Sequence, residues 1–362
     1  MLTSKTDKTK PSEMKLQDLF MLVLFFTLMP DPSGTSAVNL RNNTCMVTSP
    51  GTESTGKYEM VVAADGSGDY TSIQAAINAT KAFPDRRITI FIKNGIYKEK
   101  IRVYSWNTML TLKGESAEKT IITWDDYFDK INLGRNSTFH TYTLKVEAND
   151  FVAENLTVEN TAGPVGQAVA LHVEGDRCQF LNCRIRGNQD TLYTAGEGSR
   201  QYYKGCFIEG TTDFIFGEAT AVFDDCIINS KSNSYITAAS TPKGKVFGFV
   251  FLHCRLTADE GITRGYLGRP WRDHAKVVYL NCEMGAHILP EGWANWSGTG
   301  RDKTAFYAEY ENTGPGSAPG KRQPWSHQLT KEEALKYRLK TIFSAEYAKS
   351  CGQDNWLPEV NR

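Results

Sequence analysis

The sequence has no excess of either charge, because 41 lysines and arginines balance 41 aspartates and glutamates. A neutral chain lacks the basic field that holds nucleic acid or an anionic membrane surface. Cysteine is scarce: eight in 362 residues are too few for a small disulfide-built scaffold. The thirty glycines follow no G-X-Y period, which excludes collagen. With 40% apolar and 23% charged residues, the chain is instead expected to fold as a sizeable domain with a real core.

Long hydrophobic runs are also scarce. The uncharged run Leu19–Met29 is eleven residues long, which is too short to span a bilayer but typical of a signal-peptide core. Lys15 precedes this run, and the small residues 35–37 follow it as a cleavage site. A buried core helix is the alternative, but no polar periodicity flanks the run. We therefore predict a signal peptide over residues 1–37, with Met14 as an alternative start, then a polar linker over 38–56 and a secreted, extracellular protein of the cell wall or a digestive fluid.

If the protein is secreted, its five N-x-S/T sequons are candidate glycosylation sites. They begin at Asn42, Asn78, Asn136, Asn155 and Asn295.

The body of the chain is a repeat. An aromatic residue, two mostly polar residues, a cysteine and an apolar residue return every 20–28 positions, in segments that begin at residues 180, 203, 223, 251 and 279. Self-similarity on this scale indicates stacked coils. The runs between turn residues are short and rich in β-branched side chains, and no leucine-rich pattern is present. We therefore predict an all-β fold, a right-handed parallel β-helix with short capping helices at its ends.

Two helices are expected near the ends of the stack. Residues 70–80 have the pattern of a short amphipathic helix that would cap the coils. Residues 330–333 have the form of a capping box and should begin a helix that runs to about Lys340. This helix would belong to a C-terminal tail, residues 326–362, that packs on the β-helix.

The repeated cysteines allow two interpretations. Cys183, Cys206, Cys226, Cys254 and Cys282 occupy the same place on successive coils, where thiols would form an inward-facing stack. Alternatively, neighbouring coils lie about 4.8 Å apart, within the Cα separation of a disulfide. Cys206–Cys226 is the candidate pair. Because C-x-x-C motifs and Cys/His clusters are missing, no metal site is predicted.

Candidate chemistry lies at one angular position on three coils. Gln167, Asp190 and Asp213 are 23 residues apart, which would stack them on adjacent rungs with Gln189 beside Asp190. Two carboxylates about 5 Å apart cannot ionise equally, so they supply one acid and one anion. The alternative is an outward ladder of solvated polar residues.

The local sequences at these positions favour catalysis. Four segments resemble, in the same order, the signature motifs of pectin methylesterases: Gln167–Leu171, Gln189–Leu192, Asp213–Gly217 and Leu267–Trp271. Asp65–Asp69 and Gly95–Glu99 are similar to N-terminal segments of that family. The resemblance covers residues 57–325. It implies a right-handed parallel β-helix that hydrolyses the methyl esters of homogalacturonan, without the inhibitor-like pro-region of many plant members.

The resemblance also implies a role for each matching residue. Asp213 would be the nucleophile and Asp190 the general acid and then base. Gln167 and Gln189 would donate hydrogen bonds to the oxyanion, and Arg269 would keep Asp213 ionised. Thr138 and Trp271 match substrate-binding positions, and four aromatic residues are candidates for stacking on sugar rings: Tyr193, Phe214, Trp293 and Trp296.

Methyl-esterified pectin is the expected partner, together with proteinaceous pectinesterase inhibitors. The protein is expected to be a monomer without a cofactor. The segment 150–157 and a GPVG loop one residue shorter before Gln167 depart from the common plant form, which concerns substrate preference rather than catalysis.

Three rival functions remain open from the sequence. The first is another pectin-degrading enzyme on the same fold, although neither a calcium-binding carboxylate cluster nor a polygalacturonase-like aspartate set is seen. A serine esterase is the second, but the sequence has no G-x-S-x-G elbow. The third is a non-catalytic β-helix that binds polysaccharide.

Overall fold

A computed structural model describes residues 57–344 and 354–358. The predicted signal peptide and the polar linker lie outside these residues. Within the described residues, no helix is long and apolar enough to cross a membrane.

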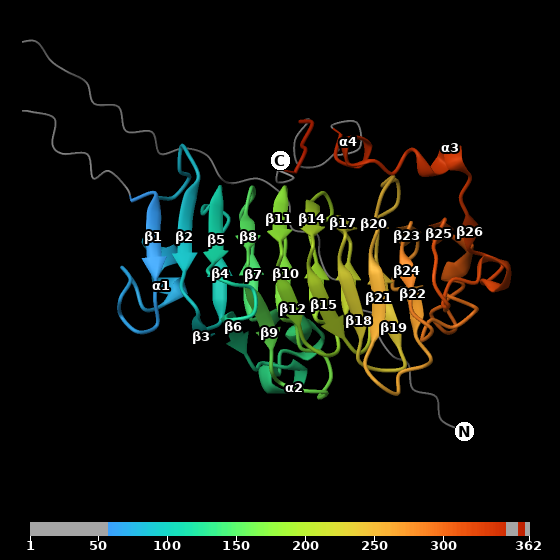
Figure 1. The fold of residues 1–362 in the computed structure, drawn as a ribbon, viewed down its shortest axis with the longest axis horizontal. Helices are drawn as coiled ribbons and strands as arrows, with labels where there is room; N and C mark the ends of the chain where they lie inside the picture. Colours follow the sequence, from blue (N-terminus) through green and yellow to red (C-terminus); the bar gives the residue numbers. More distant parts are fainter. Residues whose placement is uncertain (1–56, 345–353, 359–362) are drawn as a thin grey trace, which may run out of the picture. The chain divides into compact units, whose positions relative to one another are not determined.

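Parallel strands form three long sheets, and successive strands of the chain visit the sheets in turn. The chain thus winds into the predicted right-handed parallel β-helix (Figure 1). The first sheet, sheet A, contains β1 (Glu59–Val62), β2 (Ile88–Ile92), β5 (Leu110–Gly114), β8 (Val152–Glu154), β11 (Cys178–Leu181), β14 (Arg200–Lys204), β17 (Thr220–Asp224), β20 (Phe249–Leu252), β23 (Lys276–Leu280), β25 (Phe306–Tyr310) and β26 (His327–Gln328).

The other two sheets complete each coil. Sheet B contains β3 (Gly95–Lys98), β6 (Thr120–Trp124), β9 (Thr157–Asn160), β12 (Arg184–Arg186), β15 (Phe207–Gly210), β18 (Ile227–Ser230), β21 (Arg255–Ala258) and β24 (Glu283–Met284). Sheet C contains β4 (Ile101–Val103), β7 (Leu144–Val146), β10 (Leu171–Val173), β13 (Leu192–Thr194), β16 (Ile215–Gly217), β19 (Tyr235–Ala239) and β22 (Tyr266–Pro270).

The repeated sequence segment marks the corner between sheets A and B rather than a single strand. Its aromatic residue lies in a sheet A strand, and its cysteine follows a residue with positive φ, such as Asn182 at 50° or Asn281 at 52°. Asparagine tolerates this left-handed conformation better than most residues, because its short polar side chain can bond locally. The polar residues of the repeat therefore make the bend that the coil needs.

Side chains of the repeat fill the lumen. The five aromatic residues form a continuous stack along the axis, in which adjacent ring centroids are 4.2 to 4.9 Å apart: Phe180, Tyr203, Phe223, Phe251 and Tyr279. The five cysteines line up beside them and are buried. Burial of both rows gives each coil an apolar contact with the next, which supports the inward-facing interpretation of the cysteines.

The predicted Cys206–Cys226 disulfide is wrong in this structure, where both residues are free thiols. Each thiol instead points to a backbone carbonyl of the preceding coil: Cys206 Sγ donates to Phe180 O at 3.2 Å and Cys226 Sγ to Tyr203 O at 3.4 Å. Side chains at equivalent positions of in-register parallel strands point the same way. The two sulfur atoms are therefore separated by about the distance between strands, which is longer than a disulfide bond. Adjacency of the coils alone was not sufficient for a bridge.

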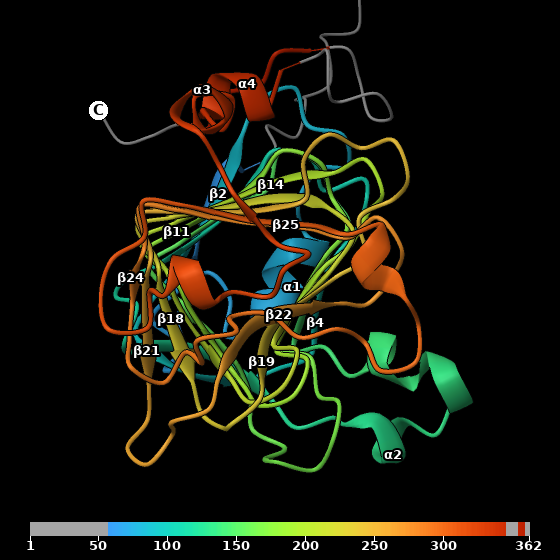
Figure 2. The same cartoon turned by 90° about the vertical axis from the view of Figure 1, so that its right-hand side faces the viewer.

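The ends are covered by short helices. α1 (Ile73–Asn78) lies over the first end of the coil, where it buries Ile73, Ala76 and Ile77, and Ser72 caps its N-terminus (Figure 2). This confirms the first predicted helix. Three further short helices, α2 (Phe128–Ile131), η1 (Gly134–His140) and η2 (Arg301–Lys303), belong to loops beside sheet C, and η3 (Pro319–Lys321) precedes the tail.

The described residues of the C-terminal tail pack on the outer face of sheet A (Figure 2). Thr330 and Glu333 form the predicted capping box. The single helix expected to run to about Lys340 is wrong, since the chain forms two separate turns, α3 (Lys331–Ala334) and α4 (Leu339–Ile342). The break lets Tyr337 and Phe343 both pack on the apolar outer face of the sheet.

Candidate active site

The two aspartates occupy equivalent places on adjacent coils of sheet C. Asp190 lies two residues before β13, and Asp213 lies two residues before β16. Because Leu192 pairs with Ile215, the 23-residue offset predicted from the sequence is confirmed for this pair. Both residues have positive φ, 62° for Asp190 and 50° for Asp213, which aspartate tolerates. The coil register therefore fixes the two carboxyl groups side by side.

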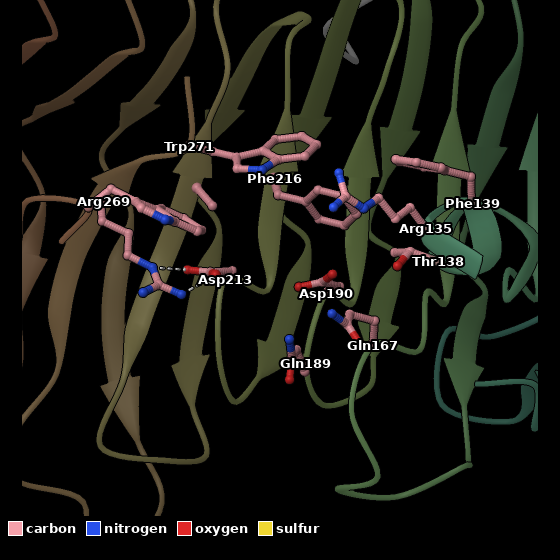
Figure 3. A pocket seen from close by; sticks show the side chains of 12 residues that line it. Arg135, Thr138, Phe139, Gln167, Gln189, Asp190, Asp213, Phe216, Arg269 and Trp271 are labelled. Carbon is pink, nitrogen blue, oxygen red and sulfur yellow. Dashed lines mark hydrogen bonds and ion pairs between the residues drawn. The ribbon is translucent and has the colours of Figure 1, made fainter. Parts of the chain in front are cut away.

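The predicted stacking of Gln167 directly on Asp190 is wrong by one residue. Gln167 forms a parallel bridge with Gln189, and the amide of Ala168 donates to Gln189 O at 3.1 Å. The offset between β10 and β13 is 21 residues, because Leu171 pairs with Leu192. At Gln167 itself the offset is 22 residues, so Gln167 lies opposite Gln189, and both amides remain at the edge of the same pocket (Figure 3).

Arg269 holds Asp213 with two hydrogen bonds. Its Nε donates to Asp213 Oδ1 at 3.0 Å, and its Nη2 donates to Oδ2 at 2.7 Å (Figure 3). The guanidinium carbon lies 4.0 Å from the ring centroids of both Tyr235 and Trp296. A bidentate pair between two aromatic faces leaves the guanidinium few alternative orientations.

Burial and charge give the two carboxyl groups different protonation. Burial and the negative charge of Asp213 raise the pKa of Asp190 well above its usual range, although Arg269 opposes the shift. The pKa of Asp213 is also raised, because burial outweighs the hydrogen bonds and charge of Arg269, which act to lower it. Because the guanidinium binds Asp213 directly, it favours the charged form of Asp213 and leaves Asp190 as the group that holds a proton more readily.

These groups face an open cavity of about 280 Å³ on the outer side of sheet C. Eight predicted residues line it: Thr138, Gln167, Gln189, Asp190, Asp213, Arg269, Trp271 and Trp296. Tyr193 lies beside the cavity wall, where its ring stacks on Phe216 at 4.6 Å and contacts Phe139 at 5.2 Å. The structure thus brings together the five proposed catalytic residues and most of the proposed binding residues.

Two predicted sugar-stacking residues do not reach the cavity. Phe214 and Trp293 are both fully buried in the lumen of the β-helix. Phe214 directly precedes β16, and its ring belongs to the buried core together with the side chain of Ile215. A ring in the lumen cannot stack on a sugar, so these two assignments are wrong.

Four lining residues were missed from the sequence: Arg135, Phe139, Phe216 and Ala238. The 23-residue offset itself could have found Phe216, since it pairs with Tyr193 on the neighbouring strand. Arg135 and Phe139 lie in η1, a segment with no repeat pattern, and only their closeness to Thr138 could have suggested them.

A carboxylate held by an arginine, a second buried carboxyl group with a raised pKa and two side-chain amides in one open groove define a β-helical enzyme with an aspartate pair. Comparisons with known proteins identify which one. The Pectinesterase family model matches residues 59–346, and the chain therefore belongs to this family and is an esterase. The match runs past the predicted domain boundary at residue 325 and includes β26, α3 and α4.

Individual relatives agree with this assignment. The chain is 41% identical to Pectinesterase 31 of Arabidopsis thaliana over 281 residues, which cover 75% of this chain and 88% of that protein. The structure of the pectin methylesterase from carrot covers 78% of this chain and 92% of its own, with 34% identity and a TM-score of 0.73. A pectin methylesterase in complex with hexasaccharide VII covers 83% and 98%, with 27% identity and a TM-score of 0.69.

Other relatives carry pectinesterase inhibitor in their names as well, and the chain spans about half of their length. One of these, from Arabidopsis thaliana, is 38% identical over 82% of this chain and 50% of that protein.

Among the residues that the structure describes, no group of three or more His, Cys, Asp or Glu side chains is arranged to hold a metal ion.

Proposed function

We propose that the protein hydrolyses the methyl esters of galacturonate units in pectin and releases pectate and methanol. The observation that carries this proposal is the arrangement of Asp213, ion-paired with Arg269, next to a buried Asp190 with a raised pKa in an open groove. One carboxylate is ready to attack, and the other carboxyl group is ready to donate a proton.

In the first step an oxygen of Asp213 attacks the C6 carbonyl carbon of the ester. Charge develops on the carbonyl oxygen, and the side-chain amides of Gln167 and Gln189 donate hydrogen bonds to it, each worth roughly 3 kcal/mol in such a role. The bond from C6 to the methoxy oxygen then breaks. The leaving oxygen takes the proton of Asp190, so methanol departs and an acyl-enzyme anhydride on Asp213 remains.

In the second step Asp190 is an anion and acts as the base. It removes a proton from a water molecule, whose oxygen attacks the same C6 carbon. The anhydride bond to Asp213 breaks, which returns Asp213 to its carboxylate form and leaves the proton on Asp190. The product is a free uronic acid, which ionises in water. Arg269 stabilises the Asp213 anion at the beginning and end of this cycle.

The proposal extends to location and partners. The predicted signal peptide supports an extracellular protein, and the family supports methyl-esterified pectin as the substrate and proteinaceous inhibitors as binding partners. The substrate groove faces outward from a single chain, which supports action as a monomer.

Methanol release from highly methylated pectin by the purified full-length protein tests the proposal. Asp213→Asn and Asp190→Asn should each lose at least about 100-fold in kcat, as expected for a nucleophile and a general acid. Asp225→Asn is the matched control, because Asp225 has a similar φ of 56° at a corner far from the cavity.

The variants also separate catalysis from binding alone. Retained pectin binding with lost turnover in Asp213→Asn supports the esterase. A folded parent that binds pectin but releases no methanol between about pH 4 and pH 9 would refute it and favour a polysaccharide-binding β-helix.

A further inference from the structure

Trp293 is one of the largest fully buried side chains of the protein. Its ring lies 5.8 Å from Tyr279 and 4.7 Å from Tyr307, inside the β-helix. Its indole Nε1 donates a hydrogen bond of 3.2 Å to Oε1 of Glu309, which is itself buried. The ring is therefore fixed both by packing and by a charged acceptor.

Glu309 is fixed in turn by Arg322. The Nε of Arg322 donates to Glu309 Oε1 at 2.7 Å, and its Nη2 donates to Oε2 at 3.1 Å. The same guanidinium donates to three backbone carbonyls, those of Leu289 at 3.2 Å, Pro290 at 3.1 Å and Gly316 at 2.9 Å. A buried ion pair with this many satisfied donors defines one conformation of the loop before Trp293.

The loop has no room for a side chain at residue 292. Gly292 has a φ of 66°, and a Cβ at this position would lie 2.5 Å from Cδ of Arg322. Glycine is therefore required both by the backbone conformation and by the guanidinium beside it.

The backbone of this loop supports the strand that carries Arg269. Trp293 forms a parallel bridge with Gly268, the amide of Leu267 donates to Gly292 O at 2.7 Å, and that of Ala294 donates to Gly268 O at 3.1 Å. Gly268 lies so close to Thr237 Oγ1 that a Cβ could not be accommodated. The segment 267–269 is therefore held between the loop on one side and β19 on the other.

The same loop covers the guanidinium of Arg269. Trp296 follows Trp293 by three residues, and its ring lies 4.0 Å from the guanidinium carbon of Arg269, opposite Tyr235. A shift of the loop would move both the strand partner of Gly268 and one of the two ring faces that orient Arg269.

We propose that Trp293 is a positioning residue for the esterase site, which acts from the lumen through Arg269. With Glu309 and Arg322 it holds the loop 289–296, and the loop holds the Arg269 guanidinium against Asp213. When Arg269 is less well oriented, the buried Asp213 loses part of the interaction that keeps it ionised. This inference depends on the proposed function, in which Asp213 attacks as a carboxylate.

The test is the pH dependence of methanol release by Trp293→Phe, which keeps an aromatic ring but loses the indole N–H. The acid limb of kcat/KM should move up by about 0.5 to 1 pH unit, part of the 1–3 units that a neighbouring guanidinium contributes. Activity should therefore fall most at low pH and recover at high pH. Trp296→Leu, which removes the ring over Arg269 directly, should shift the limb in the same direction.

Tyr307→Phe is the matched control. Tyr307 contacts the same ring of Trp293, and its buried hydroxyl has no hydrogen-bond partner among the described residues. Removing this hydroxyl should leave the acid limb where it is. If Trp293→Phe does not fold, Trp293→Leu removes the indole N–H without adding a new donor, and its acid limb is measured in the same way.

The outcomes distinguish positioning from simple packing. A lower melting temperature with an unchanged acid limb, in a folded Trp293 variant, overturns the inference. The inference is also overturned if the acid limb of a Trp293→Phe/Trp296→Leu double variant shifts by the sum of the two single shifts. Both changes should act through the guanidinium of Arg269, so their effects should not add. If the parent releases no methanol, or Asp213→Asn keeps its activity, the proposed function has failed instead.

Discussion

The ion pair between Arg269 and Asp213 makes a quantitative prediction about pH. Arg269 donates two hydrogen bonds to a carboxylate whose residue is only 6% exposed, so the interaction is poorly screened by water. A guanidinium in such a position lowers the pKa of an aspartate by about 1–3 units. Arg269→Gln removes this effect, whereas Arg269→Lys keeps the charge but loses the planar two-bond contact.

We therefore expect the acid limb of kcat/KM to move up by about 2 units in Arg269→Gln and about 1 unit in Arg269→Lys. The sign follows from the nucleophile: a raised pKa leaves Asp213 protonated, and inactive, at pH values where the parent is ionised. Well below the limb, kcat/KM should fall about 100-fold and 10-fold respectively, since one unit corresponds to a factor of ten. At pH values above the acid limbs of all three proteins, the parent and the two Arg269 variants should have the same kcat/KM.

The assay is methanol release from methylated pectin over a series of buffers at constant ionic strength. Arg272→Lys is the control, because Arg272 lies over Trp271 on the same rim and does not bind Asp213. An equal loss of activity at every pH in both Arg269 variants would refute the reasoning. Arg269 would then contribute to substrate or transition-state binding rather than to the ionisation of Asp213.

Three further predictions concern the cavity, the thiols and the tail. Phe216→Ala should raise KM for pectin several-fold with a smaller change in kcat, because the ring lines the cavity and carries no group that takes part in the reaction; initial rates measure both. Thiol titration of the unfolded protein should find Cys206 and Cys226 reduced, and a Cys206–Cys226 peptide pair in a mass spectrum would contradict the free-thiol stack. Asp176→Asn should destabilise the protein by about 3–5 kcal/mol, since it leaves buried Arg200 without its main partner, whereas Asp354→Asn, at the exposed end of the same network, should cost about 1 kcal/mol or less. Thermal unfolding compares the two, and equal losses would be inconsistent with the burial of the first pair.

The parts of the fold that could be predicted from the sequence were those that repeat. One aromatic residue and one cysteine on each coil fill the same narrow lumen. Their recurrence in the sequence therefore indicated both the number of residues per coil and which side chains face inward. The same recurrence predicted that Asp190 and Asp213 lie side by side, which the strand register confirms. A constant offset is a strong constraint, because in-register parallel strands carry equivalent residues to equivalent positions.

Prediction was less accurate where a coil changes length. The coil that joins Gln167 to the next rung is shorter than 23 residues, and this moved Gln167 opposite Gln189. One residue fewer between two paired positions is enough for such a shift, and the composition of residues 168–188 does not specify where that residue is lost. The pairing could be determined only from the hydrogen bonds of the adjacent strands.

Trp293 was the hardest residue to place, because nothing nearby in the sequence decides which way it faces. It follows β24 in a loop without the period-two pattern that separates inward from outward side chains. Its direction is set by Glu309 and Arg322, which are 16 and 29 positions further along the chain, within and beyond the next strand, β25. An aromatic residue close to catalytic motifs was therefore interpreted as a sugar contact. In the folded protein Trp296, three positions later, faces the cavity, while Trp293 faces the lumen and anchors the loop that carries Trp296.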